Sequence, residues 1–310
     1  MNTTLLPNSN IWIAYGGVLL FLVAGSGITR YLVNAFPDRD YTNLRLRVRT
    51  WWMIVPALIG ALTIGPTAIV LLFAIASAVT LHEYLVLTGS SHQPVPVLAA
   101  IYAATPILYA LAYYADNVSI GLFIPLYCLL LVSVIFAVRR GAGVWRTSAT
   151  VLLGVFLTVF CLSYIARLVT LSGGNGLVLF LLMITQLNDV SQYISGKMFG
   201  RTPLAPTLSP NKTREGMLGG LATTAVIASF LGPLLTPLSS LIAVIYGTAL
   251  ALAGVAGDLT VSAIKRMAGV KDAGKLLPGH GGFFDRVDSL IYTAPLFFYG
   301  ILVWQEMQPY

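Results

Sequence analysis

Residues 118–138 read VSIGLFIPLYCLLLVSVIFAV, an apolar stretch without a single charged side chain. A helix needs about 20 apolar residues to cross the hydrocarbon core of a membrane, which is about 30 Å thick. Similar stretches recur along the chain of 310 residues, of which 57% are hydrophobic and only 9% are charged. Soluble domains carry about 25% charged residues. The sequence therefore predicts an all-α, polytopic membrane helical bundle. It excludes a disordered chain, a nucleic-acid-binding module and a secreted disulfide scaffold.

Ten stretches are candidate membrane helices. The second is short, and Gly65-Pro66, a strong turn signal, separates it from the third. One broken span covering both, which leaves nine spans, is the alternative. The N-terminus, MNTTLLPNSN, lacks the positive residues and the cleavage site of a signal peptide, so we expect the first span to be permanent. The candidates are residues 11–29, 51–64, 67–87, 96–115, 118–138, 148–170, 177–195, 217–235, 239–257 and 287–304.

The basic residues predict the orientation, because Lys and Arg collect on the cytoplasmic side of membrane proteins. With ten alternating spans, all of the 18 Lys and Arg residues except Arg167 lie on one side. Nine spans would place the later basic loops across the membrane from the first. We therefore expect ten spans in the cell (inner) membrane, with both termini away from the cytoplasm. The segment 44–50, LRLRVRT, either sets the orientation alone or also rests on anionic lipid headgroups.

Acidic side chains at the ends of the predicted spans converge on the same side. Acids within membrane helices are costly and are functional candidates by default. Each could instead pair with a nearby Lys or Arg to solubilise a helix end. Carboxylates beside a basic, glycine-rich loop are typical of a site for Mg²⁺ and a phosphorylated substrate, because Mg²⁺ prefers hard oxygen ligands. These acids are Glu83, Asp189, Asp258, Asp285 and Asp288.

Two polar segments rich in Gly and Pro, residues 186–220 and 257–288, contain four of these acids. The second offers basic side chains and glycine backbone that phosphate can approach closely. The first offers hydroxyls and a Lys at the start of a helix. His280 could donate to phosphate or shuttle a proton. The other candidates for phosphate contact are Ser209, Asn211, Lys212, Thr213, Lys265, Arg266, Lys271, Lys275, Gly279, Gly281 and Gly282.

The segment 262–288, SAIKRMAGVKDAGKLLPGHGGFFDRVD, resembles the signature of the phosphatidate cytidylyltransferases, also called CDP-diacylglycerol synthases. An upstream block is also similar, so the likeness extends from residue 186 to the C-terminus. The signature residues are Ser262, Lys265, Arg266, Lys271, Asp272, Gly274, Leu277, Pro278, His280, Gly281, Gly282, Asp285, Arg286 and Asp288. Those of the upstream block are Asp189, Tyr193, Gly196, Phe199-Gly200, Leu204 to Pro206, Ser209 to Thr213 and Glu215-Gly216.

Two residues depart from the family pattern. Gln192 stands where the family usually has Ala, and Arg214 where it often has an aromatic or aliphatic residue. Neither change removes a metal-type ligand. Both could reshape the nucleotide or lipid pocket, as in a divergent paralogue with an altered substrate preference.

The resemblance implies transfer of a cytidylyl group from CTP to phosphatidate, giving CDP-diacylglycerol and pyrophosphate for phospholipid synthesis. The lipid phosphate attacks the α-phosphorus of CTP directly, so positioning and charge neutralisation supply the catalysis. The implied partners are CTP, phosphatidate and membrane lipids, without nucleic acid, and a homodimer is left open. We expect N-terminal membrane helices in residues 1–175 and a catalytic region in residues 176–310, with cytoplasmic loops 196–216 and 258–286.

The same resemblance implies Mg²⁺ as the cofactor, with a second cation left open. Asp258 and Asp285 are the expected metal ligands, with Asp189 and Asp288 beside them. Lys212, Lys265 and Arg266 would neutralise the charge of the pyrophosphate or lipid phosphate. The expected substrate contacts are Ser209, Asn211, Lys212, Thr213, Lys271, His280, Gly281, Gly282 and Arg286.

Three other functions compete with this interpretation. A CTP-dependent polyprenol or lipid kinase shares the nucleotide and the membrane, but the long signature argues against it. A transporter usually places polar residues near the midplane of the membrane and shows inverted repeats. Here the ionisable residues gather at one face, and no repeat is evident. A CDP-alcohol phosphotransferase needs its own DG…AR…G…D…D run, which the sequence does not contain.

Overall fold

The computed structural model describes residues 9–37, 40–141, 143–274, 276 and 281–307, and most of them are helical. A short hairpin, β1 (Pro203–Ala205) paired antiparallel with β2 (Ser209–Thr213), follows α8. The helices are α1 (Ser9–Ala35), α2 (Thr42–Ile64), α3 (Pro66–Leu87), α4 (Val95–Tyr114), α5 (Asn117–Val138), α6 (Val144–Val155), the π-helical η1 (Phe156–Phe160), α7 (Cys161–Thr170), α8 (Gly174–Phe199), α9 (Arg214–Leu235), α10 (Ser240–Met267) and α11 (Phe284–Glu306). The predicted helical membrane bundle is confirmed.

Each of the ten predicted spans corresponds to a helix, with α6, η1 and α7 together forming the sixth. Among the described residues, nine helices are long and apolar enough to cross a membrane. The other long helix, α2, contains Arg45, Arg47 and Arg49 in its first two turns. The predicted span 51–64 is therefore the apolar part of a longer helix. The helix begins earlier because long basic side chains can reach water while their stems lie along apolar surface.

The chain breaks between α2 and α3 at Gly65, whose φ of +130° suits glycine. Pro66 is the first residue of α3, where its missing N–H is no loss because that group would have no partner within the helix. The two helices pack against each other. Residues 42–87 therefore form two packed helices and not one broken span.

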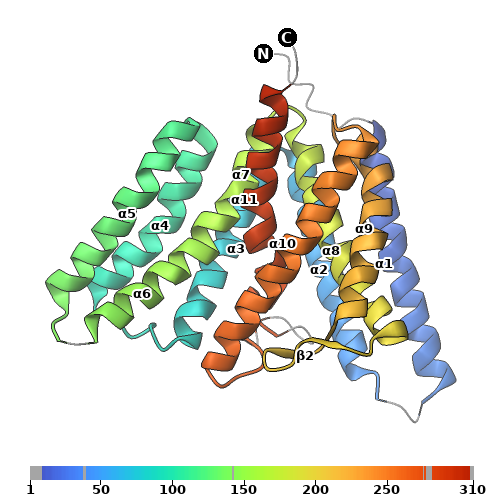
Figure 1. Cartoon of the computed structure of the whole chain (residues 1–310), viewed down its shortest axis with the longest axis horizontal. Helices are drawn as coiled ribbons and strands as arrows, with labels where there is room; N and C mark the ends of the chain where they lie inside the picture. Colours follow the sequence, from blue (N-terminus) through green and yellow to red (C-terminus); the bar gives the residue numbers. More distant parts are fainter. Residues whose placement is uncertain (1–8, 38–39, 142, 275, 277–280, 308–310) are drawn as a thin grey trace.

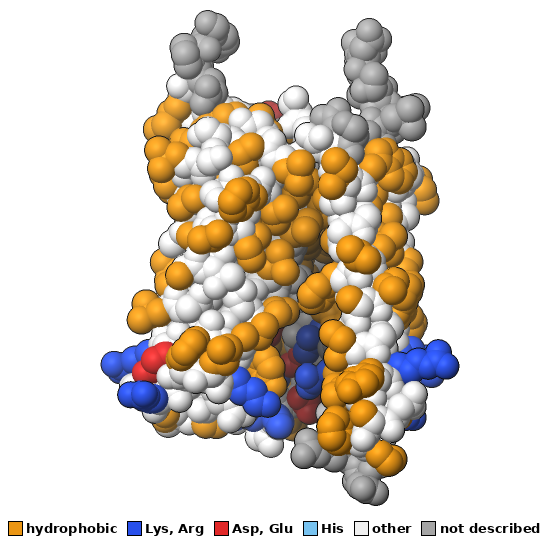
Figure 2. Space-filling model, turned by 90° about the vertical axis from the view of Figure 1, so that its right-hand side faces the viewer, with side chains coloured by type: hydrophobic (Ala, Val, Ile, Leu, Met, Phe, Trp, Pro, Cys, Tyr) orange, Lys and Arg blue, Asp and Glu red, His pale blue; other side chains and the backbone are white. Residues whose placement is uncertain are grey.

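The helices lie side by side, and Figure 1 shows that α1 begins and α11 ends at the same end of the bundle. The α1–α2, α5–α6, α8–α9 and α10–α11 connections share the opposite end. On the face shown in Figure 2, the Lys and Arg side chains gather toward that opposite end. We call it the basic end. Arg167, in the last turn of α7, belongs to a helix that ends at the other side, as the alternating topology predicts.

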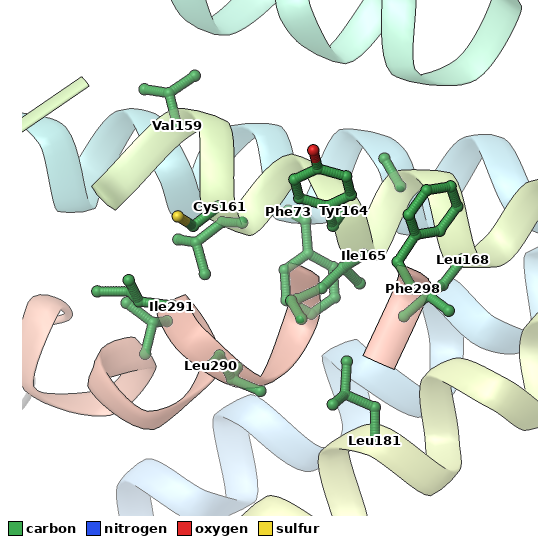
Figure 3. Close-up of a cluster of buried hydrophobic side chains, with 14 of the residues drawn as sticks. Phe73, Val159, Cys161, Tyr164, Ile165, Leu168, Leu181, Leu290, Ile291 and Phe298 are labelled. Carbon is green, nitrogen blue, oxygen red and sulfur yellow. The ribbon is translucent and has the colours of Figure 1, made fainter. Parts of the chain in front are cut away.

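The interior of the bundle is built where α7 packs against α11 and α3. Tyr164 and Leu168 of α7 meet Phe298 of α11 there, and Phe73 of α3 and Leu181 of α8 lie in the same cluster (Figure 3). Lipid tails are as apolar as these side chains, so close van der Waals packing, and not exclusion from water, holds membrane helices together. This core forms a rigid scaffold behind the polar segments of the basic end.

Glycines bring α8 and α9 close together. A Cβ atom on Gly216 would lie 2.9 Å from the Gln192 carbonyl oxygen and 2.9 Å from the Gly196 Cα, which is closer than real Cβ contacts. Small residues of this kind let membrane helices approach at backbone distance. The contact fixes the end of α8 against the start of α9, the region of the predicted first loop.

The two predicted loops are shorter than expected. The helices α8 and α10 continue to Phe199 and Met267, past the predicted span ends at 195 and 257, because helices persist into the headgroup region, where charged side chains reach water. The predicted loop 196–216 contains the hairpin. In the predicted loop 258–286, Asp258 and Lys265 lie on the helix α10 and not on a loop.

Candidate active site

The last turns of α10 present three polar side chains on one face, two of which belong to the signature. Asp258, Ser262 and Lys265 are spaced at i, i+4 and i+7, which places them one above the other on a helix. The Ser262 hydroxyl donates to Asp258 Oδ1 at 3.2 Å. The helix therefore holds a carboxylate and an ammonium group about two turns apart at the basic end.

The hairpin brings Lys212 to this face. Lys212 Nζ forms an ion pair with Asp258 Oδ2, and the two side chains are 22% and 24% exposed. Thr213 begins α9 as its N-cap and accepts from the Gly216 N–H at 3.1 Å. Glu215 Oε2 accepts from the backbone N–H groups of Arg201 and Thr202, which closes the base of the hairpin. These caps fix the position of Lys212 over α10.

Asp285 anchors the glycine-rich loop that precedes α11. Its Oδ1 accepts from Lys265 Nζ at 2.5 Å. Its Oδ2 accepts from the backbone N–H of Ala273 at 2.9 Å and of Gly282 at 3.0 Å. The Asp285 side chain is buried, at 5% exposure, and the Lys265 side chain is largely buried, at 12%. One carboxylate thus joins α10, the loop and α11.

Glu83 holds the same loop from the N-terminal half of the chain. Its Oε2 accepts from the Phe284 N–H at 2.8 Å, and Glu83 is only 5% exposed. A Cβ atom on Gly274 or Gly282 would lie 2.6 Å from a Glu83 carboxylate oxygen, so only glycine lets the loop lie this close. Glu83 Oε1 has no hydrogen-bond partner among the described residues.

A second group of acids lies beside Asp258. Asp189 of α8 accepts from the Ser289 hydroxyl at 3.3 Å, and Asp288 of α11 accepts from the Ser289 N–H at 2.7 Å. Asp189 and Asp288 lie near enough to Asp258 and to Arg286 for their charges to interact. The site thus draws its acids from α8, α10 and α11.

Asn188 is a positioning residue that the sequence analysis missed. It is fully buried next to Asp189, donates to the Ala251 carbonyl at 3.4 Å and accepts from the Thr224 hydroxyl at 3.2 Å. It therefore ties α8 to α10 and α9 at the depth of the acids. The sequence does offer a signal for this residue, because Asn188 is an amide in a largely apolar helix and directly precedes Asp189.

The other predicted site residues that the structure describes lie in different parts of the basic end. Arg266 donates to the Leu208 and Val270 carbonyls, at 3.2 and 2.9 Å, and so contacts the hairpin turn. Ser209 pairs with Ala205 in the hairpin. Asn211 and Lys271 are exposed, whereas Gly281 and Gly282 lie in the anchored loop. Lys275, Gly279 and His280 lie outside the described residues.

Gln192 and Arg214, the two residues that depart from the family pattern, lie at the α8–α9 contact and at the start of α9. Gln192 faces α9, where a Cβ atom on Gly220 would collide with the Gln192 side chain and lie 3.3 Å from its Cα. Arg214 is exposed at the start of α9, and its N–H donates to the Thr202 carbonyl at 2.9 Å. Gln192 therefore belongs to the α8–α9 packing, and Arg214 extends from the hairpin surface.

The donor chemistry at the basic end fits a hard cation. The acids that interact across the site, Asp189, Asp258 and Asp288, offer the carboxylate oxygens that Mg²⁺ prefers. Within the described residues, no three His, Cys, Asp or Glu side chains are arranged closely enough to form a metal-binding group. Asp258 and Asp285 instead each pair with a lysine. Metal binding by these four aspartates stays a prediction.

Comparisons with known proteins identify the family of this chain. A sequence model of the "Cytidylyltransferase family" matches residues 45–304. The chain is 42% identical over 287 residues to the "Uncharacterized protein YnbB" of Escherichia coli, covering 90% of this chain and 94% of the relative. It is 32% identical over 275 residues to a "Phosphatidate cytidylyltransferase" of Mycobacterium bovis, covering 83% and 88%. A protein of the same name from Aquifex aeolicus is 37% identical over 198 residues, covering 64% and 71%. The chain belongs to the cytidylyltransferase family of nucleotidyltransferases.

Proposed function

We propose that this chain transfers the cytidylyl group of CTP to phosphatidate, releasing pyrophosphate and forming CDP-diacylglycerol. The proposed site is the basic end of the bundle, facing the cytoplasm from the cell membrane. The observation that carries the proposal is the pair of lysine–aspartate contacts, Lys212–Asp258 and Lys265–Asp285. They join the hairpin, which belongs to the upstream block, to α10 and α11, which carry most of the signature. The family and the relatives named phosphatidate cytidylyltransferase support the same reaction.

The two lysines suit the neutralisation of phosphate. The oxygen of the lipid phosphate bonds to the α-phosphorus of CTP while the bond to pyrophosphate breaks, so negative charge shifts toward the leaving group. Lys212 approaches the carboxylates from the hairpin, and Lys265 approaches them from α10. Phosphate oxygens can replace a carboxylate as the partner of each ammonium group. Charge placed in advance, where charge develops during the reaction, lowers the barrier.

The anchored loop orients the site. Asp285 accepts from Ala273 and Gly282, and Glu83 accepts from Phe284, so the described parts of the loop are fixed at three backbone N–H groups. A fixed backbone keeps the lysines and acids in place without reorganisation during the reaction. In this proposal Asp285 and Glu83 position the loop, and Lys265 and Lys212 contact the phosphates.

Mg²⁺ is the proposed cofactor, and Asp189, Asp258 and Asp288 are its expected ligands, with Asp285 supporting them from the first turn of α11. When bound, the ion would neutralise the triphosphate and stabilise charge on the attacking and leaving oxygens. Arg286 lies near Asp189 and Asp288 and balances their charge. This arrangement accounts for several acids at a site that receives anionic substrates.

The position of the site suits a substrate that stays in the bilayer. On the face shown in Figure 2, a hollow runs along the bundle and has basic and acidic side chains near its lower end. A phospholipid could keep its acyl chains in the membrane while its phosphate reaches the site sideways. The site also lies at one end of the bundle and not at its middle, which disfavours a transporter.

A defined assay tests the reaction and separates it from the kinase alternative. Purified protein receives Mg²⁺, labelled CTP and one acceptor lipid at a time. The expected products with phosphatidate are pyrophosphate and a CDP-lipid, whereas CDP and a phosphorylated alcohol would support the kinase. Asp258→Asn should abolish turnover. Asp116→Asn is the matched control, because Asp116 caps α5 away from the site and Asn caps equally well. Turnover with other acceptors but not with phosphatidate would refute the assigned acceptor.

A further inference from the structure

A cavity of about 550 Å³ lies between α1 and α2, apart from the proposed active site. Its lining comes from residues 26–34 of α1 and 45–52 of α2, which include none of the lysines and aspartates described above. On α1 the lining residues Ser26, Thr29, Arg30 and Val33 recur at helical spacing. The α2 lining residues are Arg45, Val48, Arg49 and Trp52, which follow the same spacing. Each helix therefore turns one complete face toward the cavity.

Three arginines, Arg30, Arg45 and Arg49, are among the residues that line this cavity. All three side chains are exposed, and none takes part in either of the two ion pairs found within the described residues. Asp40 is close enough to act on Arg45, but its Oδ1 accepts from the Thr42 N–H at 2.8 Å at the start of α2. Among the described residues, no Asp or Glu lines the cavity. Three positively charged arginine side chains beside one cavity favour the binding of an anion there.

The lining of the cavity combines polar and apolar side chains. Arg30 lies just over one turn from the end of α1, and Arg49 about two turns from the start of α2. Deeper in the bundle, Trp52 Nε1 donates to the Ser26 hydroxyl at 2.8 Å and joins the two helices. Val33 and Val48 add apolar surface. Trp favours the membrane interface, where one side of the ring is apolar and the other is wet.

We propose that this cavity binds the phosphate headgroup of an anionic phospholipid, which does not react there. Guanidinium groups match phosphate geometry, and basic clusters beside membrane helices bind anionic lipids. The apolar surface beside the arginines favours a lipid over free phosphate, because an acyl chain can cover it. The lipid would connect α1, which packs on α2 and α9, to the rest of the bundle. This inference does not depend on the proposed reaction.

Native mass spectrometry of the full-length protein in detergent tests the site. The probes are phosphatidylglycerol and phosphatidylcholine with the same acyl chains, which differ in net charge. We expect one phosphatidylglycerol molecule to bind more tightly than phosphatidylcholine. Arg45→Gln/Arg49→Gln should weaken phosphatidylglycerol binding about 25-fold, because each basic side chain near the membrane surface contributes about fivefold to the affinity and two are removed. Arg140→Gln/Arg146→Gln, which removes two exposed charges elsewhere, is the matched control and should change the affinity less than twofold.

Three outcomes would overturn the proposal. They are equal binding of both lipids, unchanged binding by the Arg45/Arg49 variant, and complete displacement of the lipid by millimolar inorganic phosphate, which would indicate a site for free phosphate. If the double variant does not fold, Arg30→Gln alone should weaken binding about fivefold. Asp258→Asn separates this site from the proposed function. That variant should lose turnover and still bind phosphatidylglycerol, so failure of one proposal leaves the other standing.

Discussion

Lys212 of the hairpin and Asp258 of α10 form an ion pair, although the whole of α9 and most of α10 separate them in the chain. A second pair, Lys265–Asp285, lies deeper and joins α10 to α11. Both pairs join a lysine to an aspartate, but the second is less exposed to solvent. We therefore expect the two pairs to contribute different amounts to the free energy of unfolding.

Removing the buried lysine should cost more stability than removing the exposed one. Lys265→Met leaves Asp285 buried without its cation, and we expect a loss of about 3 kcal/mol in the free energy of unfolding. Lys212→Met should cost about 1 kcal/mol or less, because that pair is partly exposed to solvent. Reversible unfolding in mixed micelles measures both. Equal losses would show that burial does not set the strength of these pairs. Both variants should lose cytidylyl transfer.

Glu83 should act through its acceptor oxygen and not through its charge. Glu83→Gln keeps an oxygen that can accept from Phe284, so we expect a folded protein with at least a third of its turnover. Glu83→Ala removes the anchor, and turnover should fall by about 100-fold, as when a group that positions others is lost. Limited proteolysis of the loop around residues 268–283 should accelerate only in the alanine variant. Similar behaviour of the two variants would refute the anchoring role.

The contact between Gln192 and Gly220 predicts a compensating pair of substitutions. Gly220→Ala places a Cβ atom against the Gln192 side chain and 3.3 Å from Asn188 Oδ1, and overpacking of this kind costs about 1–3 kcal/mol. Adding Gln192→Ala should restore at least half of the lost stability, measured as the melting temperature in detergent. No recovery in the double variant would mean that Asn188, and not Gln192, limits this position.

Arg167 should stabilise the bundle without affecting catalysis. It donates to the Ala115 carbonyl at 2.5 Å and to Asn117 Oδ1, and its guanidinium lies 5.5 Å from the centre of the Phe298 ring. Hydrogen bonds to charged groups contribute about 1.5–3 kcal/mol each, so Arg167→Ala should lower the free energy of unfolding by about 3 kcal/mol. Turnover per folded molecule should stay unchanged. A specific loss of turnover would place Arg167 in the catalytic pathway.

Removal of divalent cations should stop the reaction but leave the fold intact. Chelation with EDTA should abolish CTP turnover, and added Mg²⁺ should restore it. The melting temperature of the protein without substrate should change little, because the lysines already neutralise Asp258 and Asp285. Turnover that persists in EDTA would refute the metal proposal. Asp189→Asn should raise the Mg²⁺ concentration needed for half-maximal turnover.

The fold was largely predictable because the membrane imposes a simple pattern on a sequence. Apolar stretches located the helices, and Gly65-Pro66 marked the turn between α2 and α3. The helix ends were less predictable. The extensions of α2, α8 and α10 carry polar residues that hydropathy assigns to loops, yet the headgroup region supports both helices and charges. The hairpin at 203–213 was missed for a similar reason, since short strands in a polar segment have no hydropathy pattern.

The sequence alone determined which residues are chemically able to act and at which end of the bundle they lie, because hydropathy and charge are local properties of the chain. It could not determine their partners. That Lys212 meets Asp258, that Asp285 uses its second oxygen to hold the loop, and that Glu83 reaches Phe284 depend on the packing of distant segments. The cavity between α1 and α2 likewise exists only because two helix faces with arginines lie opposite each other. Contacts between segments arise from the tertiary structure, where glycines at helix crossings set how closely those segments approach.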